Sequence, residues 1–272
     1  MNQAQPLSSF KNPKLQFVRE LLRDRKARET TGLFVVEGVR LTEEALRHPL
    51  VKPHMVLISP NLSERGRKLL QQKGFEPNEL IEIPEDVMDR LSDTETAQGV
   101  LLVIPQKIEL LPQHSNLVVI LDQVRDPGNM GTILRSAAAA GVGSVFTAPG
   151  SVDPYNPKVV RAAMGAHFHI PIIQADWSQI REYCKEKQTP PLEVILAEAQ
   201  NGESMWQMNL ASPLAIIIGS EAYGSGAEAH SLADKRVCIP MPGKFESLNA
   251  GVAASLLLYE VIRQRKHLNL PI

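Results

Sequence analysis

The sequence predicts an α/β protein made of two consecutive domains, the second of which contains a mainly parallel sheet. Short apolar runs of strand length alternate with amphipathic segments of helix length along most of the 272 residues. The alternation pauses at a polar stretch over residues 105–116 that holds two prolines. The next apolar run, residues 117–121, is continuous, as is typical of a parallel strand buried on both faces. We therefore expect a small domain over residues 1–105, a linker over 106–116 and a larger domain over 117–272.

The first domain opens with a basic helical stretch over residues 11–28, in which Leu15, Val18 and Leu21 form a narrow apolar stripe. The strands expected after it are residues 33–36, 55–58, 78–83 and 100–104, and the helices are residues 39–47, 62–73 and 85–91. This order of elements is that of a small α/β domain.

The second domain repeats the alternation on a larger scale. The strands expected here are residues 117–121, 144–147, 170–173, 193–196, 214–218 and 236–239, and the helices are residues 130–140, 158–165, 176–187 and 248–266. Strands joined through helices usually run parallel, so the pattern predicts a mainly parallel sheet.

The composition excludes several classes of protein. Hydrophobic residues make up 43% and charged residues 22% of the chain, as in soluble globular proteins. The net charge is −1, so contacts to nucleic acid would have to come from local basic patches. Two cysteines and scattered histidines predict neither a disulfide framework nor a metal site. The sequence shows no signal peptide and no apolar run of about 18 residues, which predicts a cytoplasmic protein without a membrane span.

The first candidate site follows the strand at 117–121, where a turn rich in Asp, Pro, Gly and Asn leads into a helix that begins near Asn129. Asn129 is either the N-cap of that helix or a ligand contact. Arg135 is either a solvated charge or a group aimed at a phosphate or carboxylate. The helix around Arg135 is largely apolar, which favours the second role.

The second candidate site is the glycine-rich loop over residues 219–226, directly after the strand at 214–218. Open α/β sheets place ligands at such strand ends, which favours a binding role for Glu221 over that of a turn residue. The glycine spacing matches neither a dinucleotide fingerprint nor a P-loop, so dinucleotides and nucleoside triphosphates are disfavoured.

The third candidate site is the segment 239–249, in which a strand passes through a stiff loop with two prolines into a helix. Ser247 or Asn249 could simply cap that helix. Alternatively, the two short polar side chains and the backbone N–H groups of the helix start could hold a polar ligand.

Together the three segments resemble, in order and spacing, the three motifs of the SpoU (TrmH-type) branch of the SPOUT RNA methyltransferases. The match is carried by residues 129–135, 219–224 and 239–249. The resemblance implies a catalytic domain with a parallel sheet and a deep trefoil knot. It also implies S-adenosylmethionine as cofactor, methylation of a ribose 2′-hydroxyl in RNA, and a homodimer whose active site draws on both subunits.

The same resemblance implies roles for particular residues. The positions that match active-site residues are Asn129, Arg135, Glu221, Ser247 and Asn249, and those that match the cofactor-binding segments are Gly219, Ile239, Gly243 and Leu248. Because a guanidinium stays protonated, we expect Arg135 to grip the adjacent phosphate and to stabilise the developing alkoxide, while the proton passes to phosphate or water.

The first domain resembles the substrate-binding domain of rRNA-specific members of this family, through residues 34–38 and 94–100. Its fold is similar to a small ribosomal protein that binds kinked RNA. The resemblance implies RNA as partner, with 23S rRNA favoured, and the phosphate contacts expected from the basic stretch are Lys11, Lys14, Arg23, Arg25, Lys26 and Arg28.

Other functions are less well supported by the residues. A nicotinamide-dependent Rossmann enzyme would need the missing glycine fingerprint. A non-catalytic RNA-binding protein leaves the presence of Arg135, Glu221 and Asn249 unexplained. Within the family, a tRNA 2′-O-methyltransferase and an antibiotic-resistance enzyme remain open alternatives.

Overall fold

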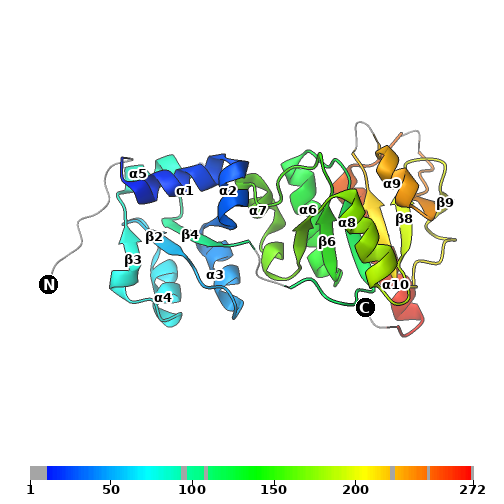
Figure 1. The fold of residues 1–272 in the computed structure, drawn as a ribbon. Helices are drawn as coiled ribbons and strands as arrows, with labels where there is room; N and C mark the ends of the chain where they lie inside the picture. Colours follow the sequence, from blue (N-terminus) through cyan, green and yellow to red (C-terminus); the bar gives the residue numbers. More distant parts are fainter. Residues whose placement is uncertain (1–10, 93–96, 107–109, 221–223, 244–245, 271–272) are drawn as a thin grey trace. The chain divides into compact units, whose positions relative to one another are not determined.

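The computed structural model describes residues 11–92, 97–106, 110–220, 224–243 and 246–270 (Figure 1). The chain forms two compact units, one of residues 1–108 with 155–168 and the other of residues 109–154 with 169–272. None of the described helices is both long and apolar enough to cross a membrane.

The first unit is built on a mixed four-stranded sheet of order β1-β4-β2-β3. The strands are β1 (Leu33–Glu37), β2 (Met55–Ile58), β3 (Leu80–Glu82) and β4 (Val100–Pro105), and the helices are α1 (Pro13–Arg23), α2 (Arg25–Thr31), α3 (Val39–Arg47), α4 (Glu64–Gln72), the 3-10 turn η1 (Pro77–Glu79) and α5 (Glu85–Leu91). Strand β4 runs antiparallel to β1 and β2, and only the β2–β3 pair is parallel.

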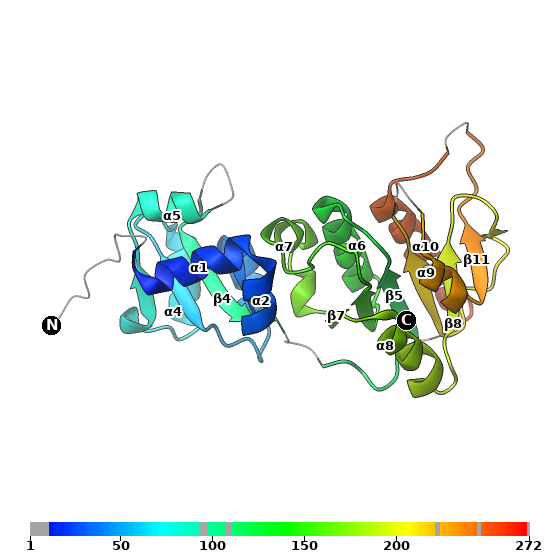
Figure 2. The same ribbon diagram turned by 45° about the horizontal axis from the view of Figure 1, so that its top comes forward.

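Hydrophobic side chains cover both faces of this sheet. Along β4, Leu101 and Val103 face a core shared with α1 and α5, whereas Val100, Leu102 and Ile104 face a core shared with α3 and α4. Figure 2 shows α1 lying across the strands. This two-sided burial explains why the strand is apolar at every position rather than at alternate ones.

The basic stretch does not form one helix as predicted. It divides into α1 and α2 at Asp24, whose backbone is extended (φ −111°, ψ 119°) and whose side chain accepts a hydrogen bond of 2.8 Å from the backbone N–H of Lys26. Asp is a favoured N-cap, so Asp24 ends one helix and starts the next.

Residues 155–168, which the sequence prediction includes in the second domain, pack with the first unit. They form α7 (Pro157–Ala163) and the 3-10 turn η2 (Ala166–Phe168). Tyr155 lies with its ring centroid 5.0 Å from that of Phe34, and Phe168 is buried in the same cluster. Aromatic burial therefore draws this segment to the first unit.

The second unit contains a seven-stranded sheet of order β7-β6-β5-β10-β8-β11-β9. Its strands are β5 (Leu117–Leu121), β6 (Ser144–Thr147), β7 (Ile172–Gln174), β8 (Glu193–Ala197), β9 (Glu203–Ser204), β10 (Leu214–Ile218) and β11 (Lys235–Cys238). All pairs among these strands are parallel, which confirms the predicted parallel sheet.

The helices of this unit are α6 (Pro127–Ala139), α8 (Trp177–Arg181), the π-helix η3 (Glu182–Lys187), α9 (Ala227–Leu232) and α10 (Ala250–His267). Helices α8, η3 and α9 share a core with one face of the sheet, and in Figure 1 α8 and α9 lie in front of it and α10 behind. Helices α6 and α10 pack against each other. The sequence prediction missed the short strand β9, gave no bounds for the helix α9 after the glycine-rich loop, and treated α8 and η3 as one helix.

Candidate active site

A cavity of about 410 Å³ opens at the carboxyl ends of three adjacent strands, β10, β8 and β11. The loops that follow these strands and the start of α10 surround it. Its lining is formed by residues 197–201, Ile218, Gly219, Ser220, Gly224, Ser225, Val237, Ile239, Met241, Ser247, Leu248, Ala250, Ala253 and Leu257. This volume is in the range of small-molecule sites, and parallel sheets place ligands at this edge.

The glycine-rich loop after β10 forms one wall of the cavity. Ser220 and Gly224 exchange two backbone hydrogen bonds of 3.1 and 2.9 Å, which close the loop on itself. A Cβ atom at Gly219 would lie 2.3 Å from Ser225 Oγ and 3.1 Å from the backbone carbonyl carbon of Gly224. A larger residue at the predicted cofactor position Gly219 would therefore displace the Ser225 hydroxyl and press on the backbone of Gly224. Glu221, the predicted catalytic residue of this loop, lies outside the described residues.

A buried carboxylate holds the C-terminal end of this loop, at Gly226. Asp122, directly after β5, is 1% exposed and accepts a hydrogen bond of 2.7 Å from the backbone N–H of Gly226. Burial raises the pKa of Asp122, and the nearby Glu228 carboxylate adds to the effect. Sequence reasoning did not select Asp122, although an acidic residue at the end of a central strand was an available signal.

The segment after β11 forms the opposite wall. Ile239, Ser247 and Leu248 line the cavity. Gly243 is exposed and lies on the same loop but is not among the lining residues. Helix α10 begins at Ala250, two residues later than predicted, because Asn249 is its N-cap and accepts a hydrogen bond of 3.2 Å from the N–H of Val252.

Asn129 and Asn249 meet at the start of α10. Asn249 Nδ2 donates a hydrogen bond of 2.8 Å to Asn129 Oδ1. Asn129 is not the N-cap of α6, because that helix begins one turn earlier: Asp126 is the cap and accepts a hydrogen bond of 2.8 Å from the N–H of Asn129. The structure thus joins two predicted active-site residues that are 120 positions apart in the chain.

Close packing of α6 on α10 makes this contact possible. A Cβ atom at Gly251 would lie 2.9 Å from Thr132 Cγ2, and the hydroxyls of Ser136 and Ser255 are 2.7 Å apart. Arg135 belongs to the same helix, and its side chain is exposed. Arg135 does not line the cavity, so any ligand that it contacts must approach from outside.

The loop after β8 forms the third wall, which sequence reasoning missed. Glu198, Gln200 and Asn201 contribute polar side chains to the cavity. A Cβ atom at Gly202 would lie 2.6 Å from the backbone carbon of Val237, so this loop presses directly on β11. Its signal in the sequence was its position after a buried strand, but strand order in the sheet was needed to place it beside the other two loops.

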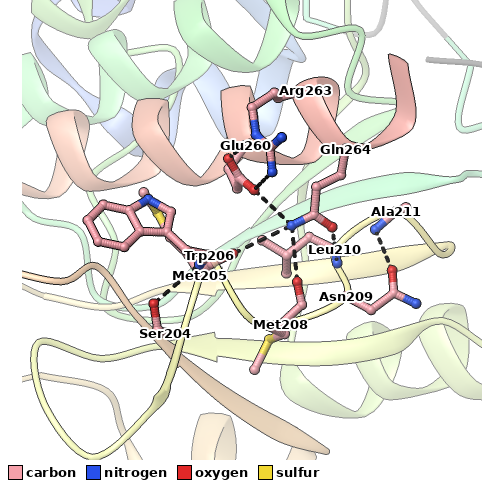
Figure 3. Close-up of polar contacts among 10 residues, drawn as sticks. All are labelled: Ser204, Met205, Trp206, Met208, Asn209, Leu210, Ala211, Glu260, Arg263 and Gln264. Atoms are coloured by element: carbon pink, nitrogen blue, oxygen red, sulfur yellow. Dashed lines mark hydrogen bonds and ion pairs between the residues drawn. The ribbon is translucent and has the colours of Figure 1, made fainter. Parts of the chain in front are cut away.

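The C-terminal half of α10 holds the segment that continues from this loop (Figure 3). Gln264 Oε1 accepts a hydrogen bond of 2.8 Å from the N–H of Leu210, and its Nε2 donates to the carbonyl of Met208 at 3.0 Å. The Nε2 also donates to Glu260, which forms a bidentate pair with Arg263. One helix therefore lines the cavity at its start and anchors the chain between β9 and β10 near its end.

The basic residues predicted to bind RNA lie on α1 and α2 of the first unit. Lys14, Arg23, Arg25 and Lys26 are exposed there, and Lys11 is exposed just before α1. Arg28 is different: it is 2% exposed and its guanidinium donates a hydrogen bond of 2.6 Å to the carbonyl of Leu21. The prediction that Arg28 contacts phosphate is therefore wrong, because its charge is used to join α1 to α2.

No group of three or more His, Cys, Asp or Glu side chains that could hold a metal ion occurs among the residues whose positions are described. The parallel sheet, the cavity at its carboxyl edge and the paired amides beside it define an α/β enzyme that binds a small organic cofactor.

The chain belongs to the SpoU rRNA methylase family, whose model matches residues 116–259. Residues 12–102 match the MRM3-like substrate binding domain. The 23S rRNA (guanosine(2553)-2′-O)-methyltransferase RlmP of Bacillus subtilis is 32% identical over 259 residues, which cover 94% of this chain and 98% of that protein. The human mitochondrial rRNA methyltransferase 3 is 32% identical over 311 residues, covering 92% and 72%.

Solved structures agree with this assignment. The SpoU methyltransferase AviRb from Streptomyces viridochromogenes, in complex with AdoMet, has a TM-score of 0.85 and 28% identity and covers 94% of this chain and 98% of that one. An AdoMet-bound rRNA methyltransferase from Sinorhizobium meliloti has a TM-score of 0.80 and 28% identity, with coverage of 97% and 98%.

Proposed function

We propose that this protein is an S-adenosylmethionine-dependent methyltransferase that acts in the cytoplasm on a ribose 2′-hydroxyl of large-subunit (23S) rRNA. The observation that carries the proposal is the cavity between the loops after β10 and β11, with Asn129 and Asn249 hydrogen-bonded at its border. The named activities of the relatives agree with it.

The size and the lining of the cavity suit S-adenosylmethionine, independently of the similarity to known enzymes. Its volume, its apolar walls from Ile239, Leu248 and Leu257, and the close approach at Gly219 fit an adenosine-containing ligand held largely by backbone. Bound S-adenosylmethionine supplies an electrophilic methyl group on a sulfonium sulfur. The residues of the chain then have to orient the ribose hydroxyl and stabilise its developing negative charge. The hydroxyl proton passes to phosphate or water.

The Asn129–Asn249 pair is placed to orient the substrate. Asn249 Oδ1 is fixed by the cap of α10 and its Nδ2 by Asn129, so neither amide can rotate without losing a hydrogen bond. Ser247 adds a hydroxyl at the cavity wall. Arg135, exposed on α6, grips the phosphate next to the target ribose and stabilises the alkoxide, and Glu221 completes the site by its match to the family motif.

A second copy of the chain completes the active unit. Val252, Leu256 and Tyr259 are 46%, 42% and 54% exposed and are spaced by four and three residues, so they form one apolar stripe on α10. This stripe starts beside the cap at Asn249, and a homodimer that covers it would bring two sites together. In the same proposal the C-terminal segment threads through the trefoil knot of the family.

Two experiments test the function. Calorimetry should show binding of S-adenosylmethionine, with no binding of NAD. Mapping of 2′-O-methyl groups on rRNA and tRNA from cells with and without the gene should reveal one 23S rRNA position that loses its methyl group. Loss of a tRNA methyl group instead, or no loss at all, would contradict the rRNA assignment.

The proposed dimer has its own test. Light scattering should give the mass of a dimer for wild type and the mass of a monomer for Leu256→Asp.

A further inference from the structure

Glu198 occupies a central place in the cavity. It is the first residue after β8, which lies between β10 and β11 in the sheet, and its backbone N–H donates a hydrogen bond of 2.9 Å to the carbonyl of Val237. Its side chain is 20% exposed and lines the cavity. A carboxylate is thus held at the carboxyl edge of the middle strand.

The side chains of Arg236 and His230 lie beside this carboxylate. Arg236 Nη1 lies 3.7 Å from one carboxylate oxygen and His230 Nδ1 lies 3.7 Å from the other. Both separations exceed the length of a hydrogen bond, so these contacts orient the carboxylate and leave its lone pairs available to a ligand.

The charge of the cavity limits what can bind there. Among the lining residues that the structure describes, Glu198 is the one charged side chain, and the polar remainder are amides and hydroxyls. A carboxylate can only accept hydrogen bonds, so the ligand group that faces it must donate. Phosphate-bearing nucleotides are disfavoured for the same reason, because no Lys or Arg belongs to the described lining.

Strand order places Glu198 away from the site of methyl transfer. The helix that carries Asn129 follows β5, and β10 lies between β5 and β8. Two strand spacings separate the ends of β5 and β8, roughly 10 Å. If methyl transfer occurs near Asn129, as the proposed function requires, Glu198 faces one of the two groups that the sulfonium sulfur joins, the methionine part or the adenosine. The two oxygens of the carboxylate favour the adenosine. Its ribose presents two adjacent hydroxyl donors that match the two carboxylate oxygens.

We infer that Glu198 recognises the cofactor by accepting hydrogen bonds from the ribose hydroxyls of its adenosine. This inference rests on the proposed function. Arg236 and His230 lie beside the carboxylate and are not among the described residues that line the cavity.

The test compares Glu198→Gln with wild type by calorimetry, using three adenosine compounds. S-Adenosylmethionine, S-adenosylhomocysteine and 5′-methylthioadenosine should each bind about tenfold more weakly to the variant, because a charge-assisted hydrogen bond is replaced by a neutral one. The equal loss is expected because the three compounds share the ribose. With 2′-deoxy-5′-methylthioadenosine the difference between the two proteins should fall below about threefold.

Glu203→Gln is the matched control, because Glu203 is exposed on β9, close in sequence, and outside the cavity lining. Glu198→Asp keeps the charge and should give an intermediate loss, which guards against a general folding defect. Wild-type affinity of Glu198→Gln for all probes would overturn the inference and leave the proposed function intact. So would a loss absent with 5′-methylthioadenosine, because that compound keeps the ribose and lacks the amino-acid end of the cofactor. Failure of wild type to bind any adenosine compound would overturn both.

Discussion

In the first unit β4 runs antiparallel to both of its neighbours, whereas in the second unit every described strand pair is parallel. A parallel sheet brings the carboxyl ends of all its strands to one edge, where the loops after β8, β10 and β11 can enclose a cavity. A mixed sheet divides its loops between two edges. The first unit instead exposes basic side chains on α1 and α2.

The difference shows how one chain can meet two chemically distinct ligands. The enclosed edge of the second unit offers apolar walls and one described carboxylate, which suits a small cofactor. The open helices of the first unit offer Lys14, Arg23 and Lys26, which suit a polyanion. Perturbing the cavity lining should therefore change cofactor binding and not RNA binding, and perturbing the basic helices α1 and α2 should do the reverse.

The largest effect is expected at Arg135, which belongs to the second unit but faces outward. Arg135→Ala should lower kcat by about 100-fold or more, because charge stabilisation in the transition state is lost. The dissociation constant of S-adenosylmethionine, measured by calorimetry, should stay unchanged. Arg181→Ala, at an exposed position of α8, is the control and should behave as wild type. Near-normal turnover of Arg135→Ala would end the assigned role of this residue.

The second largest effect is expected in Gly219→Ala and concerns the binding of S-adenosylmethionine. The added Cβ meets Ser225 Oγ and the backbone of Gly224, so the loop must open. We expect about 100-fold weaker binding of S-adenosylmethionine, in line with overpacking costs of a few kcal/mol. The double variant with Ser225→Ala should recover part of the affinity, because one of the two contacts is removed. RNA binding by electrophoretic mobility shift should not change.

Removing positive charge from α1 and α2 tests the role of the first unit in RNA binding. The triple variant Lys14→Gln, Arg23→Gln, Lys26→Gln should bind RNA about tenfold more weakly at low salt, and the slope of log K against log salt should fall by roughly two. Calorimetry should give wild-type cofactor affinity. Arg65→Gln with Lys68→Gln, exposed on α4, controls for the loss of charge itself. An unchanged salt slope in the triple variant would show that α1 and α2 are scaffold only.

Asp122 connects the end of β5 to the glycine-rich loop through its hydrogen bond with Gly226. Its substitution by Ala and by Asn should have different effects on cofactor binding and on stability. Asp122→Ala leaves the N–H of Gly226 without its acceptor and should weaken cofactor binding about fivefold to tenfold. Asp122→Asn keeps an acceptor and removes a buried charge.

The pH dependence of stability separates these two effects. Because the pKa of Asp122 is raised in the folded protein, its stabilising contribution is present below the ordinary carboxyl pKa and is lost as pH rises. Asp122→Asn should therefore melt at the same or a higher temperature than wild type at neutral pH. A marked decrease in its melting temperature would show that the ionised carboxylate itself is required.

The smallest effect is expected at the end of α10. The hydrogen bonds from Arg263 lower the pKa of Glu260, so the stability that Glu260 contributes is present above its ordinary pKa of 4.5 and is lost as pH falls below it. Thermal melts of wild type and Glu260→Gln should differ slightly near neutral pH and converge in acid. Convergence at high pH instead would contradict the sign of this shift.

Local patterns in the sequence predicted much of the fold. The helix at 39–47 and the strands at 55–58, 117–121, 144–147 and 214–218 have the predicted bounds, because strong apolar runs end there at turn residues. Predictions failed where a polar side chain reorganised the backbone. Asp24 divides the first helix, and Asp126 starts α6 one turn before Asn129.

The sequence indicated single segments of the candidate site but not how these segments come together. Gly219, Ile239, Ser247 and Leu248 line one cavity, and Asn129 contacts Asn249, while their roles in cofactor binding and catalysis stay predictions. The wall formed by Glu198 and the loop support from Asp122 and Gln264 were not predicted. Those residues carry no motif of their own, and their importance depends on neighbours far away in the chain.

The sequence by itself determined the alternation of strands and helices, the parallel sheet and the three motifs that mark the family, because these follow from the spacing of nearby residues. Only the tertiary structure decided that Arg28 is buried, that residues 155–168 pack with the first unit, and that Glu198 faces the cavity. Burial and charge pairing depend on which distant segments meet, and that is set by the order of strands in the sheet.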